Sequence, residues 1–468
     1  MWAELFQVLL VLLLLVAGIH RFFLLFQSIL AEDPAIPDPL ELTEHLPKVL
    51  IQIPVFNDAS SLVAQLQRLH RIDYLRSALE IQILDDSDDG TAEGNRIAVE
   101  GIADLGVPVV HLCRDRRVGF KAGALSEGLI RSKAEFVAVF DVDFEIPEQF
   151  LLKTLAHFQA PRMGWVQCRW GYLNRTQNWL TRAQARLLDG HFRIEHRARS
   201  SARRFFNFNG TAGIWRRRAI EEAGGWSGET VVEDTDLSLR AWQGGWQGIY
   251  RDDIVCRGLL PDSFSAFRTQ QRRWLAGGMQ LMLKPENWDL AADPVERFDL
   301  AGRFLAPLTS LVVVLLTLWA PLRRIFADQL GPDPWVFRWL GTATFDGLFL
   351  FFALVSVVLF YASTGGGRMT RWWESILVLF LGTGFAFFSA ISCCAGILGQ
   401  VTIFERTPKD GGASGGRSMT GLERVMIPIL VLLVWGVLEV GAWSVLPLVL
   451  MSLVGLLWSS VESRKPQG

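Results

Sequence analysis

The sequence predicts an α/β domain with a mostly parallel sheet, joined to a bundle of transmembrane helices. Between residues 49 and 140, short apolar runs alternate with stretches of helical character, which is the pattern of βαβ units. Apolar segments long enough to cross a membrane stand before and after this region. The 468 residues are 50% hydrophobic, with a mean hydropathy of +0.26, which is higher than in an ordinary soluble protein.

The first apolar segment, residues 5 to 26, is long enough for a hydrocarbon core of about 30 Å. A signal peptide would carry Lys or Arg before the apolar run, whereas Glu4 precedes this one, and no small-x-small cleavage site follows. We therefore expect residues 1–30 to form an uncleaved anchor. Arg21 at its end places the N-terminus outside and the following domain in the cytoplasm.

Composition excludes several classes of protein. The five cysteines include no Cys-x-x-Cys pair, so neither a disulfide framework nor a zinc site is indicated. Lys and Arg number 46 against 48 Asp and Glu, and this balance gives no reason to expect a nucleic-acid partner.

After a Pro-rich linker at residues 33–47, the βαβ region can be assigned element by element. The expected strands are residues 49–53, 81–84, 107–112 and 136–140. The expected helices between them are residues 60–71, 91–102 and 121–131, and residues 182–204 are plausibly helical. The rest of the region from 144 to 290 shows no clear pattern.

Acidic residues follow two of these strands. Asp85 and Asp86 come after the second strand, and Asp141 and Asp143 come after the fourth. Because the carboxyl ends of parallel strands meet at one edge of a sheet, these carboxylates are expected to converge on a crevice. Carboxylates completed by substrate phosphates are the usual ligands of Mg²⁺ or Mn²⁺. The alternative is an acidic turn without a metal.

Residues 231–236 carry a second acidic cluster. A carboxylate there, such as Asp234, could act as a general base that takes the proton of an attacking hydroxyl group. The alternative is an acidic helix start, since Asp and Glu favour the first turn.

Residues 270–274 (QQRRW) lie shortly before the next membrane segment. Arg273 could bind a diphosphate by bidentate hydrogen bonds, and Trp274 offers an apolar face to a sugar ring. The alternative is an interfacial helix whose Arg and Trp side chains only anchor it at the headgroup level.

Five further apolar segments follow, at residues 304–320, 348–361, 376–398, 425–440 and 445–458. If all five crossed the membrane, the basic C-terminal end would lie outside, against the positive-inside rule. We expect four spans, with residues 376–398 in the interface and the loop 399–424 in the cytoplasm. Two observations oppose this topology: 376–398 is apolar enough to span, and Arg323, Arg324 and Arg338 would lie outside.

Taken together, these stretches resemble a known family. Asp85 and Asp86, the pair Asp141 and Asp143, residues 232–234 (VED) and residues 270–274 resemble its D, DxD, TED and Q(Q/R)xRW signatures. The family comprises the processive, membrane-integrated glycosyltransferase family 2 enzymes, which include cellulose, chitin and hyaluronan synthases. Residues 49–57, 117–125, 208–213 and 224–226 are also similar to stretches of cellulose-synthase-like families A and C, the plant mannan and xyloglucan-backbone synthases, and their bacterial relatives. The resemblance is strong over residues 45–285.

The resemblance implies a GT-A fold, with a Rossmann-like, mostly parallel sheet, for residues 45–290 and a membrane region for residues 300–468. It also implies a role for each matching residue. The nucleotide and diphosphate contacts would be Asp85, Asp86, Lys121, Asp141, Gln270 and Arg273, the metal ligands Asp143 and Asp141, the catalytic base Asp234, and the acceptor contacts Trp274 and Glu233.

This sequence departs from the family pattern at two places. Val232 stands where the signature has Thr, which leaves the acids intact. Residues 404–409 (FERTPK) resemble the FxVTxK gating loop, with Arg406 in place of Val. The resemblance thus implies a cytosolic loop, with Phe404, Thr407 and Lys409, that closes over the donor.

The expected function is inverting, metal-dependent and processive transfer of hexose from GDP-mannose or UDP-glucose to a growing β-1,4-glycan. The expected site of action is the cytosolic face of the inner, plasma or Golgi-type membrane, in contact with lipids, and a homodimer or an accessory subunit is possible. One alternative is single transfer to a lipid acceptor, as in ceramide glucosyltransferases. Another is a non-catalytic membrane protein of the same fold.

Overall fold

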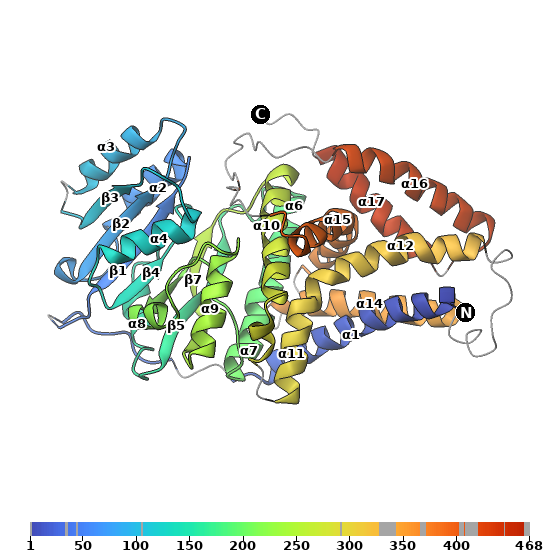
Figure 1. Ribbon diagram of the computed structural model, residues 1–468, viewed down its shortest axis with the longest axis horizontal. Coiled ribbons are helices and arrows are strands. Elements are labelled where there is room, and N and C mark those ends of the chain that lie inside the picture. The colour runs from blue at the N-terminus through green and yellow to red at the C-terminus, as the bar shows by residue number, and fades with distance from the viewer. Residues whose placement is uncertain are drawn as a thin grey trace.

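The computed structural model describes residues 2–32, 36–43, 45–103, 106–290, 293–326, 343–365, 371–401, 407, 420–443 and 445–462. Within these ranges the sheet-containing domain and the long apolar helices occupy opposite ends of the molecule (Figure 1). Further helices lie between them and join the sheet-containing domain to the apolar helices.

The sheet has seven strands in the order β3-β2-β1-β4-β6-β5-β7. Their bounds are β1 Val49–Val55, β2 Leu79–Asp85, β3 Val109–Cys113, β4 Phe136–Val139, β5 Met163–Tyr172, β6 Gly213–Arg216 and β7 Gln247–Gly258. All neighbouring strands are parallel except β6, which runs antiparallel to both β4 and β5. The predicted mostly parallel sheet is confirmed.

Each face of the sheet has its own apolar core, because successive side chains of a strand point to opposite faces. In β1, Val49 and Ile51 belong to one core and Leu50 to the other. The first core is covered by α2 Ala59–Leu69, α3 Ala92–Ala103 and α5 Phe150–Leu155. The second core is covered by α4 Phe120–Ile130, α6 Trp179–Gly190, α8 Arg217–Glu222 and α9 Glu233–Gln243.

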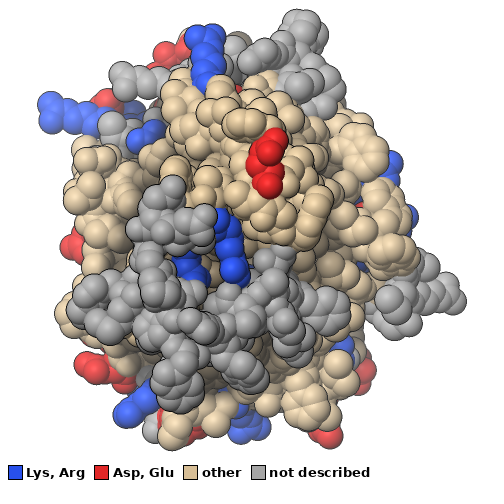
Figure 2. Space-filling view, turned by 90° about the vertical axis from the view of Figure 1, so that its right-hand side faces the viewer, with Lys and Arg blue, Asp and Glu red and all other residues tan. Residues whose placement is uncertain are grey.

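The apolar half of the chain forms the helices on the right of Figure 1. They are α1 Trp2–Leu30, α12 Thr309–Ile325, α14 Ala343–Ala362, α15 Glu374–Ile397, α16 Thr420–Glu439 and α17 Leu446–Glu462. Helix α11 Pro294–Leu305 lies in the middle of the picture and leads into α12. Among the described residues, four helices are long and apolar enough to cross a membrane, at residues 5–30, 294–325, 374–397 and 421–439. Figure 2 shows that the described surface at this end carries few charged side chains.

The helices between the two halves are α10 Phe264–Met282 and the continuous stretch of α6, a π-helix His191–His196 (η2) and α7 Arg197–Ser201. The stretch matches the predicted helical segment 182–204. Short 3-10 turns complete the fold at Arg76–Ala78 (η1), Pro285–Trp288 (η3), Ala306–Leu308 (η4) and Ser363–Gly365 (η5). A π-helix is frequent at functional sites, and this one borders the cavity described next.

Candidate active site

A cavity of about 520 Å³ opens at the carboxyl ends of the parallel strands, between the sheet and the helices η2, α9 and α10. Ligands of open α/β sheets bind at this edge. The structure brings nearly all of the predicted site residues to its wall. They are Asp86, Lys121, Asp141, Asp143, Glu233, Asp234, Gln270, Arg273, Trp274 and Thr407.

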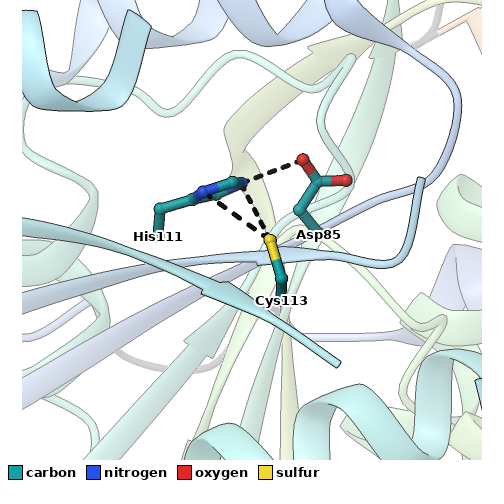
Figure 3. A group of neighbouring side chains, drawn as sticks. All are labelled: Asp85, His111 and Cys113. Atoms are coloured by element: carbon teal, nitrogen blue, oxygen red, sulfur yellow. Dashed lines mark hydrogen bonds and ion pairs between the residues drawn. The ribbon is translucent and has the colours of Figure 1, made fainter. Parts of the chain in front are cut away.

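Asp85 does not line the cavity. It instead joins strand β2 to His111 of β3, as Figure 3 shows, and to Asn95 of helix α3. Its carboxylate lies 2.9 Å from His111 Nε2 and accepts hydrogen bonds from Asn95 Nδ2 at 2.8 Å and Ser87 N at 3.0 Å. Burial alone would raise the pKa of Asp85, but these hydrogen bonds prevail and lower the pKa to about 2. The same hydrogen bonds occupy the carboxylate of Asp85. The thiol of Cys113 lies close to the imidazole of His111.

Asp86 is the member of the pair that faces the cavity. Arg114 Nε donates a hydrogen bond of 2.8 Å to Asp86, and Arg117 Nε lies 3.9 Å from its carboxylate. Arg117 also stacks on Phe56, with its guanidinium carbon 3.4 Å from the ring centroid. This end of the cavity offers a carboxylate held in place beside an aromatic ring and a cation, an arrangement suited to the edge and face of a nucleobase.

Asp141 and Asp143 occupy the turn after β4. The backbone N–H of Asp141 donates to Thr211 Oγ1 at 2.8 Å, and Asp143 Oδ2 accepts from the N–H of Leu259 at 3.0 Å. Lys121 Nζ lies 2.5 Å from Asp141 Oδ1 and forms an ion pair with it, so this pair of carboxylates binds a cationic group within the protein itself. Two carboxylates on a cavity wall are hard oxygen donors, and they fit Mg²⁺ or Mn²⁺ better than a softer ion.

Asp234 lies in the first turn of α9, which begins at Glu233. Thr235 N donates a hydrogen bond of 2.7 Å to Asp234 Oδ1. Enclosure in the cavity and the neighbouring Glu233 charge raise the pKa of Asp234 to about 7, although Lys121 opposes the shift. A carboxylate with this pKa can take a proton near neutral pH and is therefore suited to act as a general base.

Gln270, Arg273 and Trp274 project from one face of α10, because residues three and four apart on a helix are neighbours. Ser263 caps the amino end of this helix by accepting from the N–H of Ala266. The guanidinium and the indole ring are thus held on a regular element that borders the cavity.

Thr407 is the part of the predicted gating-like loop that the structure describes, and its side chain is buried in the cavity wall. The predictions for Phe404 and Lys409 fall outside the described residues. The wall also includes Phe304 of α11, Pro307 of η4 and Tyr361 of α14, so the cavity extends to the apolar helices.

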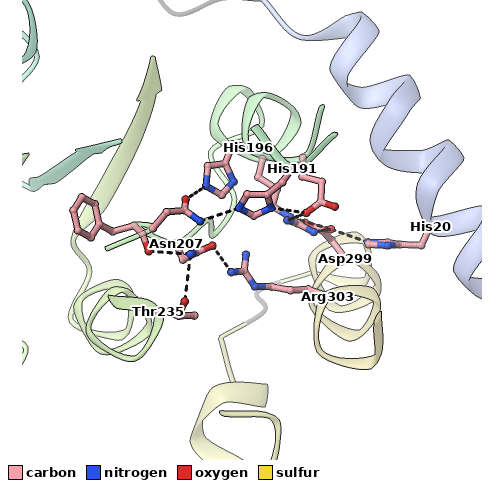
Figure 4. A network of polar contacts seen from close by, with 11 residues as sticks. His20, His191, His196, Asn207, Thr235, Asp299 and Arg303 are labelled. Atoms are coloured by element: carbon pink, nitrogen blue, oxygen red, sulfur yellow. Dashed lines mark hydrogen bonds and ion pairs between the residues drawn. The ribbon is translucent and has the colours of Figure 1, made fainter. Parts of the chain in front are cut away.

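The segment before β6 contributes residues to which we assign no role from the sequence. Gly210 adopts a positive φ of +75° and its carbonyl accepts from Lys121 Nζ at 2.9 Å. Asn207 and Asn209 line the cavity. Asn209 bridges two imidazoles, with its Nδ2 3.0 Å from His191 Nε2 and its Oδ1 2.6 Å from His196 Nε2. Figure 4 shows these two histidines side by side. The pattern of residues 208–213, which resembles the family, is the only sequence signal for this segment.

A mostly parallel sheet, carboxylates at its strand ends and a helix bearing Gln, Arg and Trp over them define the GT-A class of nucleotide-sugar glycosyltransferases. The chain belongs to glycosyl transferase family group 2, whose sequence model matches residues 136–386. This confirms the family resemblance and the predicted enzyme class.

Curated relatives agree with this family. The chain is 41% identical over 247 residues to glucomannan 4-beta-mannosyltransferase 2 of Arabidopsis thaliana, covering 52% of this chain and 46% of the relative. It is 41% identical over 258 residues to glucomannan 4-beta-mannosyltransferase 1 of Oryza sativa subsp. japonica, covering 54% and 50%. The matches thus span about half the length of these relatives.

A solved structure has the same fold. Mannosyltransferase PcManGT from Pyrobaculum calidifontis, in complex with GDP-Man and Mn²⁺, superposes with a TM-score of 0.56 at 18% identity. The match covers 83% of this chain and 99% of that chain. At this identity the likeness establishes the fold, which confirms the predicted GT-A domain.

Proposed function

We propose that the protein is an inverting, processive β-mannosyltransferase that transfers mannose from GDP-mannose to a growing β-1,4-glycan at a membrane surface. The observation that supports this proposal most directly is that one cavity holds Asp86, Asp143, Asp234, Arg273 and Trp274. The names of the relatives, which are glucomannan 4-beta-mannosyltransferases, favour mannose over glucose as the transferred sugar.

The base in this mechanism is Asp234, whose carboxylate removes the proton from an acceptor hydroxyl as that oxygen attacks the anomeric carbon. Arg273 and Lys121 lie in the same wall and neutralise charge that develops on the departing diphosphate. Trp274 holds the acceptor ring by stacking. A divalent ion held by Asp143 and Asp141 would add Lewis-acid stabilisation of the leaving group.

The direct displacement needs one base and one stabiliser of the leaving group, without a covalent intermediate, as in inverting glycosidases. All of the predicted acids except Asp85 line one cavity, which speaks for catalysis and against a non-catalytic binding protein. The extension of the cavity to Tyr361 and Phe304 supports a polymer that leaves toward the membrane helices.

The test is to supply membranes containing the protein with labelled GDP-mannose or UDP-glucose and to digest the product with a β-mannanase or a β-glucanase. We expect a polymer from GDP-mannose that the mannanase degrades. Asp234→Asn and Asp143→Asn should abolish synthesis, whereas Asp115→Asn, at an exposed position, should not. A glycolipid of discrete mass would replace this proposal with single transfer to a lipid.

We also propose that α15 lies in the membrane interface, with residues 1–30 as an anchor and four spans after residue 300. Both ends of α15 are attached to elements of the soluble half. At its start, Glu374 Oε2 accepts hydrogen bonds from Arg175 at 2.8 Å and Arg186 at 2.9 Å. At its end, Gly396 lies against the backbone of Ala276 in α10, and the carbonyl of Val401, just beyond the helix, accepts from Gln280 of α10 at 2.7 Å.

Two further observations support this placement of α15. In Figure 1 the helix is foreshortened and lies across the left-to-right direction of α1, α12 and α14. Near its start, the rings of Trp179 and Trp373 meet at 6.1 Å, and both side chains are exposed. Exposed Trp residues are typical of the membrane–water interface.

A further inference from the structure

Arg303, in the last turn of α11, reaches from the membrane-entering helix to the cavity wall. Figure 4 shows its guanidinium beside Asn207, with Thr235 on the other side of that amide. Asp299, one turn earlier on α11, is engaged elsewhere, since Arg199 lies 3.1 Å and His20 2.9 Å from its carboxylate. The hydrogen bond of Arg303 goes to Asn207 and not to this neighbouring ion-pair cluster.

Two hydrogen bonds lead from Arg303 to the side chain of Thr235, and the backbone N–H of Thr235 in turn binds the base. Arg303 Nη2 donates to Asn207 Oδ1, and Asn207 Nδ2 donates to Thr235 Oγ1 at 3.3 Å and to the carbonyl of Phe208 at 2.9 Å. The N–H of Thr235 donates to Asp234 Oδ1 at 2.7 Å. Because a guanidinium has only donors, it fixes the orientation of the Asn207 amide and turns its NH₂ group toward Thr235.

The other terminal nitrogen of Arg303, Nη1, differs from Nη2 in its surroundings. Among the described residues, Nη1 is buried and has no hydrogen-bond partner, while the guanidinium packs on Phe205 with 4.9 Å between its carbon and the ring centroid. A buried N–H without a partner is costly, and native structures normally satisfy such a group with protein, water or a ligand. Because Arg303 lines the cavity, a turn of its side chain would bring Nη1, which is closed off from solvent in this structure, to a sugar hydroxyl as acceptor.

We propose that Arg303 has two roles: through Asn207 and Thr235 it positions the base Asp234, and through Nη1 it donates a hydrogen bond to a hydroxyl of the acceptor glycan. The proposal rests on the proposed transferase function. It assigns the acceptor to the side of Asp234 that faces α11, opposite Asp86 and the nucleotide.

Kinetics with a β-1,4-mannooligosaccharide acceptor separate the two roles. Arg303→Met should lower kcat and raise the acceptor KM, each about tenfold or more, because a hydrogen bond to a charged group is lost in each role. Thr235→Val should lower kcat but leave the acceptor KM unchanged. The donor KM should stay within about twofold in both variants, because neither substitution changes the contacts that bind the donor.

The double variant and a matched control make the test strict. In Arg303→Met combined with Thr235→Val, kcat should be no lower than in Arg303→Met alone, because both changes interrupt one chain. Arg297→Met removes an exposed arginine of the same helix and should behave like the wild type. Binding of GDP to each variant reports whether it is folded, and Arg303→Lys replaces Arg303→Met if the latter does not bind GDP.

The outcomes are distinguishable. Wild-type kinetics in the Arg303 variants, or effects of Arg303→Met and Thr235→Val that multiply in the double variant, would overturn the two-role assignment while transfer itself stands. Absence of transfer by the wild type with every common nucleotide sugar would instead overturn the proposed function.

Discussion

At the scale of single residues, Asp234 has a chemical environment unlike that of Asp85. Both are enclosed carboxylates, but Asp85 accepts several hydrogen bonds and its pKa falls to about 2, whereas beside Glu233 the pKa of Asp234 rises to about 7. One carboxylate is a permanently ionised anchor, and the other can exchange a proton near neutral pH.

This difference predicts the pH dependence of transfer. A base works in its ionised form, so kcat/KM should rise as the pH increases from 6 to 8, with its midpoint near the pKa of about 7. Initial rates of sugar incorporation at subsaturating substrate would measure it. A profile without a step in this range would contradict the role of Asp234.

The same shift has a cost in stability. In the folded protein Asp234 keeps its proton up to a pH of about 7. In the unfolded chain the same carboxyl group loses its proton near its ordinary pKa of 3.8. The folded state thus binds more protons between these two values, and the contribution of this group to the free energy of unfolding falls as the pH rises through that window.

Gly210 gives a second prediction at this scale. A Cβ at this position would lie 2.9 Å from Asp234 Oδ2, and the φ of +75° is strained for any residue with a side chain. Gly210→Ala should reduce transfer at least tenfold by displacing the base, given that single misplaced groups cost about that much or more.

Gly245→Ala is the matched control for this substitution. Gly245 has a similar φ of +78°, but a Cβ there meets nothing within 4 Å. It should therefore show the backbone strain, about 1 kcal/mol, without the loss of activity. Equal activities of the two variants would show that Gly210 does not constrain Asp234.

Whether a site residue can be found from the sequence depends on whether its neighbours in the chain carry a signal. Asp141 and Asp234 can be found from the sequence, because acids after an apolar strand or at a helix start carry a local signal. Asn207 and Arg303 cannot, because an isolated amide or guanidinium has no such signal and their contact joins positions 96 residues apart. Which of Asp85 and Asp86 faces the cavity also depends on tertiary partners, here His111 and Asn95.

At the scale of elements, α15 has the length and composition of a span but the attachments of an interfacial helix. Cysteines placed at Trp372 and Leu398, both exposed, should react with an impermeant maleimide from the same side as a cysteine at Asp115 in the soluble half. A cysteine at Glu439, at the end of α16, should react from the opposite side.

The labelling should be done in inside-out and right-side-out vesicles, in a background without the five native cysteines. Labelling of positions 372 and 398 from opposite sides would show that α15 crosses the membrane. In that case the number of spans, and with it the side of the C-terminal end, would change.

The strands differ in how well the sequence predicts them. β1 and β4 are apolar runs with both faces covered, and they were predictable within a few residues. β7 contains Arg251, Asp252 and Asp253, and its pairing with β5 is irregular, so no apolar run indicates it. β6 has four residues and owes its place to long-range antiparallel pairing.

At the scale of the whole molecule, the acid pair and the cations around it should make transfer depend on a divalent ion. Chelation with EDTA should stop polymer synthesis, and Mn²⁺ or Mg²⁺ should restore it, because Asp141 and Asp143 offer hard oxygen ligands. The measurement is sugar incorporation against the concentration of added metal.

Asp143→Asn provides the control for this prediction. It should stay inactive at every metal concentration, whereas Asp115→Asn should follow the wild-type curve. Full activity of the wild type after exhaustive chelation would contradict a metal-dependent reaction.

The two ends of the strands form two edges of the sheet, and these edges should differ in how well they tolerate an insertion. Because β6 is antiparallel, its preceding segment joins the reactive edge, while the turn before β5 lies at the other edge. Residues 159–161 of that turn are exposed and are not among the residues that line the cavity. A fluorescent domain inserted there should leave polymer yield unchanged, which would allow the enzyme to be followed in a living cell while it works.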